Sequence, residues 1–346
     1  MKNITAKKKK AIIVICALIL VVAIPATGVF IFVNSYLNKI NYDNNTTLEI
    51  DPSFTEDLSG ADFDEADEDI EENLLDTRFW YNEDVINILL IGYDYGGGGK
   101  YYGRSDAMII ASINKRDNKI SYVSLSRATY VSIPGHGNAR LNAAYAYGGP
   151  NLLIETIEQN YKTRIDNYVS VDFSGFTEII DNLGGVSIEL TDKEFNYLRE
   201  SLDLKGIGTS KGAGTYKFDG ELALKYARTR SIDTDRARTQ RQRNILKALT
   251  YKAKNISLSK GLELLDDLLP IVTTDFNKKQ LVAQSTNAMK YISWDIDEAL
   301  IPRDQPGLIE INGIEVIILD WTKVRNDIHE QLYPNMEPVE SLPDDN

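Results

Sequence analysis

Cysteine and histidine are nearly absent from this 346-residue chain. Cys16 is the lone cysteine, so the chain can form neither an intramolecular disulfide nor a cysteine-based zinc site. The two histidines, His136 and His329, are too few for a histidine metal cluster and disfavour a histidine-based catalytic triad. The polar chemistry of this chain therefore rests on its carboxylates and arginines.

Charge is missing from residues 11–33, a run of 23 uncharged residues. At 1.5 Å per residue, such a helix crosses a hydrocarbon core of about 30 Å. Lysines lie in residues 1–10, so the positive-inside rule predicts a cytoplasmic N-terminus, one transmembrane helix and an extracytoplasmic remainder. A cleaved signal peptide is the alternative, but its apolar stretch would be shorter, about 7–15 residues.

Basic residues are missing from Asp43 to Asp76, which contains 14 acidic residues. The net charge is −13, yet removing these 14 from the 51 acidic residues leaves 37 against 38 basic ones. The negative charge thus belongs to one segment. Because residues 34–77 hold few large apolar side chains, we expect an acidic extracytoplasmic linker that is disordered or loosely attached.

Strand and helix patterns alternate from about Arg78 to residue 333, and a polar tail follows at 334–346. This alternation predicts an α/β sandwich of three-layer type, with a mixed central β-sheet flanked by helices. Strands are expected at 85–91, 108–113, 119–125, 168–173, 186–190 and 313–319. Helices are expected at 151–162, 175–183, 219–228, 236–254, 261–269, 277–292 and 321–332.

The segment Arg228–Arg243 contains six arginines and no lysine. The planar guanidinium binds two phosphate oxygens at once, whereas lysine offers a point charge. This density predicts a site for a highly charged phosphate group. A salt-bridged helix surface is the alternative.

Two aspartates, Asp94 and Asp106, flank a glycine-rich loop between two expected strands. If the strands pair, the carboxylates can face each other and offer hard oxygen ligands to Mg²⁺. The loop lacks the residues of a Walker A motif. In the alternative reading, Asp94 caps the loop and Asp106 pairs with Arg104.

Further arginines fall where ligands usually bind an α/β sheet, at strand ends. Arg127 ends the third expected strand, and Arg140 follows shortly after. On the expected helix 236–254, a single face carries Arg238, Arg241, Gln242 and Ile245 by their spacing.

In this order, these segments resemble the LytR-CpsA-Psr family of cell-wall glycopolymer ligases, from about Asn87 to Leu249. The matching stretches are NILLIGYD (87–94), RSD (104–106), RLNAAYAY (140–147), IDNY (165–168), VDF (171–173), LGGV (183–186), DGELALKYARTR (219–230) and RTQRQ (238–242).

The resemblance implies an enzyme of a Gram-positive-type envelope, anchored in the cell membrane. Such an enzyme transfers a glycopolymer (teichoic acid, capsule or another glycan) from a polyprenyl-pyrophosphate carrier to peptidoglycan. Mg²⁺, or Mn²⁺ in its place, would be held by Asp94 and Asp106. The catalytic residues would be Asp106, Arg127 and Arg228. The residues that would bind pyrophosphate are Arg104, Arg127, Arg140, Arg228, Arg230, Arg238, Arg241 and Gln242.

Two departures from the family pattern are present. Gly96 and its neighbours stand where the family usually has an arginine, and Ser126-Arg127-Ala128 stands where it has Pro-Arg-Asp. They favour an alternative in which the chain binds lipid-linked wall precursors without catalysis or regulates cell-wall assembly. The catalytic base is left open between Asp106 and a metal-bound water. A nucleic-acid partner is not expected, because the predicted anchor and topology place the rest of the chain outside the cytoplasm and no DNA-reading motif is present.

Overall fold

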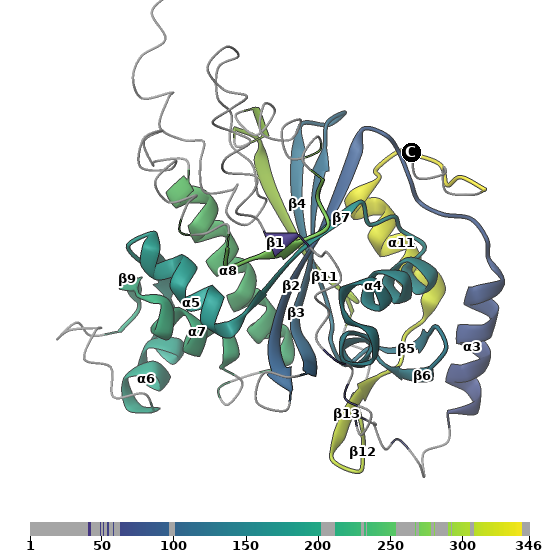
Figure 1. Ribbon diagram of the computed structural model, residues 1–346, viewed down its shortest axis with the longest axis horizontal. Coiled ribbons are helices and arrows are strands. Elements are labelled where there is room, and N and C mark those ends of the chain that lie inside the picture. Colours follow the sequence, from purple (N-terminus) through teal and green to yellow (C-terminus); the bar gives the residue numbers. More distant parts are fainter. Residues whose placement is uncertain are drawn as a thin grey trace, which may run out of the picture. The chain divides into compact units, whose positions relative to one another are not determined.

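The computed structural model describes residues 41–42, 63–96, 101–201, 212–229, 234–253, 270–277, 293–304 and 308–340, and single residues 49, 51, 54, 58, 232, 267, 280, 290 and 291 (Figure 1). The chain forms two compact units. The sheet unit comprises Asp43–Ser170 and Trp294–Asn346, and the helical unit comprises Met1–Tyr42 and Val171–Ser293. Among the described residues, no helix combines the length and apolarity needed to span a membrane. The transmembrane helix expected at 11–33 lies outside them.

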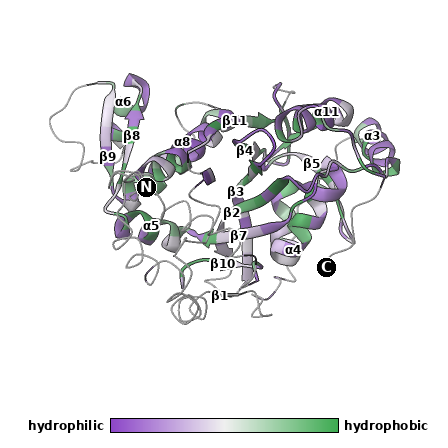
Figure 2. Ribbon diagram, turned by 90° about the horizontal axis from the view of Figure 1, so that it is seen from above, coloured by the Kyte–Doolittle hydropathy of each residue, from purple (hydrophilic) through white to green (hydrophobic). Residues whose placement is uncertain are grey.

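The sheet unit is built on the long strands β2 (Val85–Gly96) and β3 (Tyr101–Asn114). Antiparallel pairing joins β2 to β3 and β3 to β4 (Lys119–Leu125), while β11 (Asp295–Ile301) runs parallel to β4. Strand β7 (Asn167–Asp172) lies on the other side of β2. Residues 85–91 of β2 and 107–111 of β3 form nearly continuous apolar runs, as expected for strands buried on both faces, whereas other parts of the sheet strands are polar (Figure 2). The predicted α/β fold with a mixed central sheet is confirmed.

Helices α4 (Leu141–Tyr161) and α11 (Trp321–Leu332) pack on this sheet (Figure 1). Helix α4 is kinked where Gly148 and Gly149 leave helical geometry just before Pro150. These breaks interrupt the apolar periodicity, so the sequence predicted only the second half of the helix. The hairpins β5–β6 (Tyr130–Ile133, Gly137–Arg140) and β12–β13 (Leu308–Ile311, Ile314–Ile317) complete the unit.

The expectation of a loose linker is wrong for part of the acidic segment. Residues Asp64–Leu75 form helix α3, which buries Ala66, Ile70 and Asn73. The Asn73 side-chain amide donates to the Asn160 carbonyl oxygen of α4 at 2.9 Å. Acidic residues near the N-terminus of a helix also interact favourably with its dipole. A few tertiary contacts thus stabilise a helix that composition alone disfavoured.

The helical unit contains helices α5 (Phe173–Asn182), α6 (Asp192–Ser201), α7 (Gly220–Arg228) and α8 (Asp235–Ala253). Strands β8 (Val186–Leu190) and β9 (Gly214–Phe218) form a hairpin, and β1 (Asn41–Tyr42) pairs with β10 (Thr273–Thr274). A Cβ atom at Gly220 would overlap the Thr177 carbonyl oxygen of α5. The absence of a side chain at Gly220 therefore allows α5 and α7 to pack closely.

Candidate functional site

The two candidate metal ligands lie where the β2–β3 ladder is irregular. Gly92 pairs with Ala107 but Tyr93 pairs with Ser105, so Asp106 is an extra residue in β3. A second shift follows between Tyr93 and Tyr95, around Asp94. Bulges of this kind redirect side chains and are common beside active sites.

The Asp94 carboxylate contacts the backbone of the neighbouring strand β3. Its Oδ1 accepts a hydrogen bond from the Arg104 backbone N–H at 3.1 Å. A Cβ atom at Gly103 would overlap the Asp94 backbone and carboxylate oxygens, so a glycine is required at this close approach. This contact partly matches the alternative in which Asp94 caps its loop.

Asp106 forms an ion pair with Arg127, which follows β4. The Arg127 Nη1 atom lies 2.8 Å from Asp106 Oδ1, and the two side chains are 12% and 20% exposed. The structure therefore brings together two predicted catalytic residues. A partly buried, charge-assisted hydrogen bond of this length fixes the orientation of both groups.

The other two arginines of the sheet unit that were predicted as pyrophosphate ligands, Arg104 and Arg140, are also at least partly buried. Arg140 is 7% exposed and precedes the first residue of α4. The guanidinium of Arg104 lies over the ring of Phe54, 5.1 Å from its centroid. Arg104 belongs to β3, and Arg140 is the last residue of β6.

In the helical unit, Arg228 is an exposed arginine supported by an aromatic ring. It is the last residue of α7, and its guanidinium lies 4.5 Å from the centroid of Phe173 at the start of α5. A ring beneath one face of a guanidinium leaves its N–H edge available to bind an anion. Arg230 lies outside the described residues.

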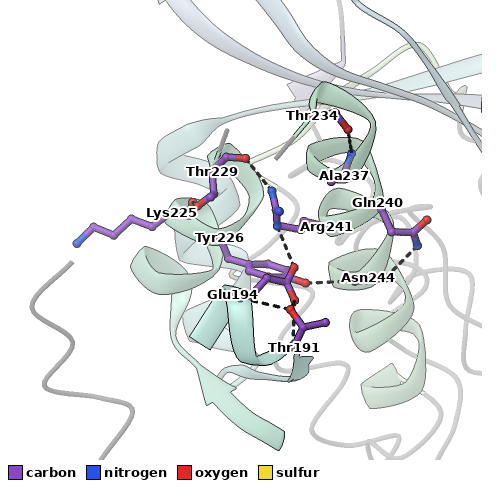
Figure 3. A network of polar contacts seen from close by, with 10 residues as sticks. All are labelled: Thr191, Glu194, Lys225, Tyr226, Thr229, Thr234, Ala237, Gln240, Arg241 and Asn244. Atoms are coloured by element: carbon purple, nitrogen blue, oxygen red, sulfur yellow. Dashed lines mark hydrogen bonds and ion pairs between the residues drawn. The ribbon is translucent and has the colours of Figure 1, made fainter. Parts of the chain in front are cut away.

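The predicted polar face of α8 is present but mostly buried. Arg238, Arg241 and Ile245 are each 1% exposed, and Gln242 is half-buried. Arg241 donates from Nε to Glu194 Oε1 at 2.9 Å and from Nη1 to the Thr229 carbonyl oxygen at 2.8 Å (Figure 3). These contacts connect α8 with α6 and with the end of α7.

Comparison with known proteins identifies the family. The profile described as LytR_cpsA_psr family matches residues 53–331. The chain belongs to the LytR-CpsA-Psr family. The resemblance stated from the sequence motifs is thereby confirmed.

Several relatives within the LytR-CpsA-Psr family carry informative names. The chain is 33% identical over 264 residues, covering 72% of this chain and 81% of the relative, to a protein named polyisoprenyl-teichoic acid–peptidoglycan teichoic acid transferase TagU, from Enterococcus faecalis. It is 35% identical over 179 residues to the TagT transferase of Bacillus subtilis, spanning 51% of this chain and 55% of TagT. A structure of TagT with bound octaprenyl pyrophosphate lipid has a TM-score of 0.56 and 25% identity, covering 73% of this chain and 93% of that one.

The carboxylates of this LytR-CpsA-Psr protein suit a hard divalent cation. Mg²⁺ is usually held by one or two carboxylates, and water and substrate phosphates complete its shell. Asp94 and Asp106 lie on paired strands and are the two carboxylates that would hold such a cation. Within the described ranges, no group of three or more His, Cys, Asp or Glu side chains could hold a metal. The donor chemistry fits Mg²⁺ or Mn²⁺.

Several residues that contact the predicted arginines were missed in the sequence, and two of them matter most in the helical unit. Phe173 lies under Arg228, and Glu194 holds Arg241. The spacing Thr191-x-x-Glu194 is a capping box, and this signal could have predicted the start of α6. No sequence signal pointed to its pairing with an arginine 47 residues later.

Proposed function

We propose that this chain is a membrane-anchored, extracytoplasmic transferase that moves a glycopolymer from a polyprenyl-pyrophosphate carrier to peptidoglycan. The names of the relatives favour teichoic acid as the polymer. The observation that carries the proposal is the Asp106–Arg127 ion pair at a bulge in β3, the strand that pairs with the one carrying Asp94, in a chain of this family. Two carboxylates with arginines provide both a cation site and anion-binding groups.

In the proposed reaction, a sugar hydroxyl of peptidoglycan attacks the phosphorus atom that carries the glycan. A new P–O bond forms, the bond to the lipid phosphate breaks, and polyprenyl phosphate leaves. Positioning and electrostatic stabilisation provide most of the catalysis in such transfers. Arg127 and Arg228 bind pyrophosphate oxygens and stabilise the charge that develops on the leaving phosphate. Asp106 is the candidate acceptor of the hydroxyl proton.

The remaining predicted residues are assigned to pyrophosphate binding. In the sheet unit these are Arg104 and Arg140; in the helical unit they are Arg230, Arg238 and Gln242. Asp94 and Asp106 would hold Mg²⁺ or Mn²⁺, which would neutralise charge on the phosphates. Arg241 has contacts that suit a positioning role.

Turnover of a lipid-pyrophosphate-linked glycan by the full-length chain in vesicles tests the proposal. Formation of glycan-bearing peptidoglycan fragments and of polyprenyl phosphate is expected. EDTA should abolish turnover, and Mg²⁺ or Mn²⁺ should restore it. Asp106→Ala and Arg228→Ala should each lose turnover, while Arg199→Ala, at an exposed pair with Glu200, should retain it.

Binding of the lipid donor without turnover, across several acceptors, would contradict the transferase. That result would favour the non-catalytic binder that the residues at 126–128 suggested. The measurement therefore separates the two functions.

A further inference from the structure

A side chain of α8 binds the C-terminal end of α7, and a side chain of α6 in turn binds that side chain of α8. Thr229 is the C-cap residue of α7 and directly follows Arg228. Carbonyl groups at a helix end lack intrahelical partners and need donors from elsewhere. The Thr229 carbonyl oxygen accepts from Arg241 Nη1 at 2.8 Å. The peptide between two predicted pyrophosphate ligands, Arg228 and Arg230, is thereby bound to α8.

Arg241 in turn depends on Glu194. Its side chain is 2% exposed and that of Glu194 is 14% exposed. A buried guanidinium is costly unless a carboxylate pairs with it. Glu194 Oε1 accepts from Arg241 Nε at 2.9 Å, so the pair fixes the plane of the guanidinium and the direction of the Nη1 donor.

Glu194 is itself held by the capping box of α6. Its Oε2 atom accepts from the backbone N–H and the hydroxyl of Thr191, at 3.1 and 2.9 Å. The two carboxylate oxygens thus have separate tasks, since one caps α6 and the other orients Arg241 (Figure 3). The contact of Glu194 with the Thr191 hydroxyl can therefore be removed by substitution without removing its contact with Arg241.

We infer that Glu194 is a positioning residue for anion binding. Acting through Arg241 and the Thr229 carbonyl, it fixes the end of α7 so that Arg228 presents its guanidinium to a pyrophosphate group. The assignment of the ligand rests on the proposed function. Arg241 then contributes to anion binding by fixing the position of Thr229 and hence of Arg228, in addition to its own positive charge.

Binding of inorganic pyrophosphate to the full-length chain, measured by calorimetry, tests the inference. Glu194→Gln is expected to weaken binding roughly tenfold, as is usual when a supporting partner of a ligand-binding group is lost. Arg241→Lys keeps the buried charge pair but loses the forked geometry, and the same weakening is expected. Thr191→Ala, the matched control, breaks the capping box but leaves the Glu194–Arg241 contact, and should change binding less than about twofold.

Melting temperatures separate positioning from folding. Thr191→Ala and Glu194→Gln should both lower the melting temperature, yet only Glu194→Gln should weaken binding. In the transferase assay, Glu194→Gln should raise KM for the lipid donor more than it lowers kcat, because ground-state binding is affected.

Several results would overturn the inference. If all three substitutions weakened pyrophosphate binding equally, Glu194 would act only as a helix cap. If Glu194→Gln and Arg241→Lys left pyrophosphate binding unchanged, Glu194 would have no positioning role. No binding by the unaltered chain would overturn both this inference and the proposed function. Binding by the unaltered chain without turnover would overturn only the transferase, and the affinities of the variants would still decide the positioning role.

Discussion

Asp106 and Arg127 depend on each other at the scale of single residues. Each is the charged partner of the other at 2.8 Å, and both are predicted to act in the reaction. Arg127→Ala is expected to lower turnover by about 10²–10³-fold, the usual cost of losing a group that stabilises developing charge. Arg127→Lys should recover little, because lysine cannot reproduce the planar fork. Steady-state kinetics beside Arg199→Lys check this, and near-normal turnover in Arg127→Ala would contradict it.

Phe173 is predicted to support Arg228 through its ring. The guanidinium lies 4.5 Å from the ring centroid, and an exposed cation–π contact contributes about 0.5–1 kcal/mol. Phe173→Leu should therefore weaken pyrophosphate binding roughly threefold, whereas Phe173→Tyr should retain it. If the leucine and tyrosine variants bound equally well in calorimetry, the ring would have no such role.

Residue types at the site could be predicted from the sequence, but their partners could not. The arginines and the two aspartates stood out by density and by their place at strand ends. The alternative pairing of Asp106 was assigned to Arg104, whereas the structure pairs it with Arg127. Asp106 is the extra residue at a register shift in β3, and bulges leave no clear trace in apolar periodicity.

At the scale of elements, strong periodicity and capping signals predicted boundaries well. The expected strand 186–190 is β8, and the expected helix 321–332 is α11. Helix α7 begins after Asp219, whose carboxylate caps the Leu222 N–H. Strand β11 and helix α3 were missed, because tertiary contacts stabilise these elements more than local pattern does. Helix α6 was also missed, although its capping box offered a local signal. The helices expected at 261–269 and 277–292 lie outside the described residues, apart from single positions.

The close packing of α5 on α7 should tolerate no side chain at Gly220. A methyl group there would overlap the Thr177 carbonyl oxygen, and the Gly220 N–H donates to Asp181 Oδ1 at 2.7 Å. Gly220→Ala should destabilise the fold by about 1–3 kcal/mol, as overpacking does. Urea unfolding measures this, with Glu178→Ala at an exposed position of α5 as the control. Equal stability of the two variants would show that the helices can move apart without cost.

Asp76 connects the end of α3 to α11 and makes this contact sensitive to acid. Hydrogen bonds from Arg78, together with its charge and that of Arg325, hold the pKa of Asp76 well below its usual value. The folded pKa thus lies below the unfolded value of about 3.9. The stabilisation is present above about pH 4 and is lost as the pH falls through the folded pKa.

Asp76→Asn should therefore be less stable than the unaltered chain at pH 7, and the difference should shrink below pH 4. Urea unfolding at pH 7 and pH 3 measures both values. Asp84→Asn, at an exposed aspartate, serves as the control and should show little difference at either pH. A constant gap between Asp76→Asn and the unaltered chain at the two pH values would mean that another group controls the acid response.

At the scale of the whole molecule, function and location depend on each other. A polyprenyl carrier remains in the membrane, so a transferase acting on it benefits from attachment to the same surface. The uncharged run at 11–33 is the expected attachment, with the lysines of residues 1–10 on the cytoplasmic side.

The expected anchor at residues 11–33 leads to predictions for how the full-length chain behaves in cells. After alkaline washing it should stay in the membrane fraction with its N-terminus intact, because a transmembrane helix resists extraction whereas a peripheral contact does not. A tag after Asn346 should be cleaved by protease added to protoplasts, and a tag before Met1 should be protected. Replacement of the four lysines at 7–10 by glutamine should lower the fraction of chains with a cytoplasmic N-terminus, since the charge bias sets topology. A chain that begins after residue 33 and is released to the medium would establish a cleaved signal peptide instead. The transferase would then need another means of reaching its lipid substrate.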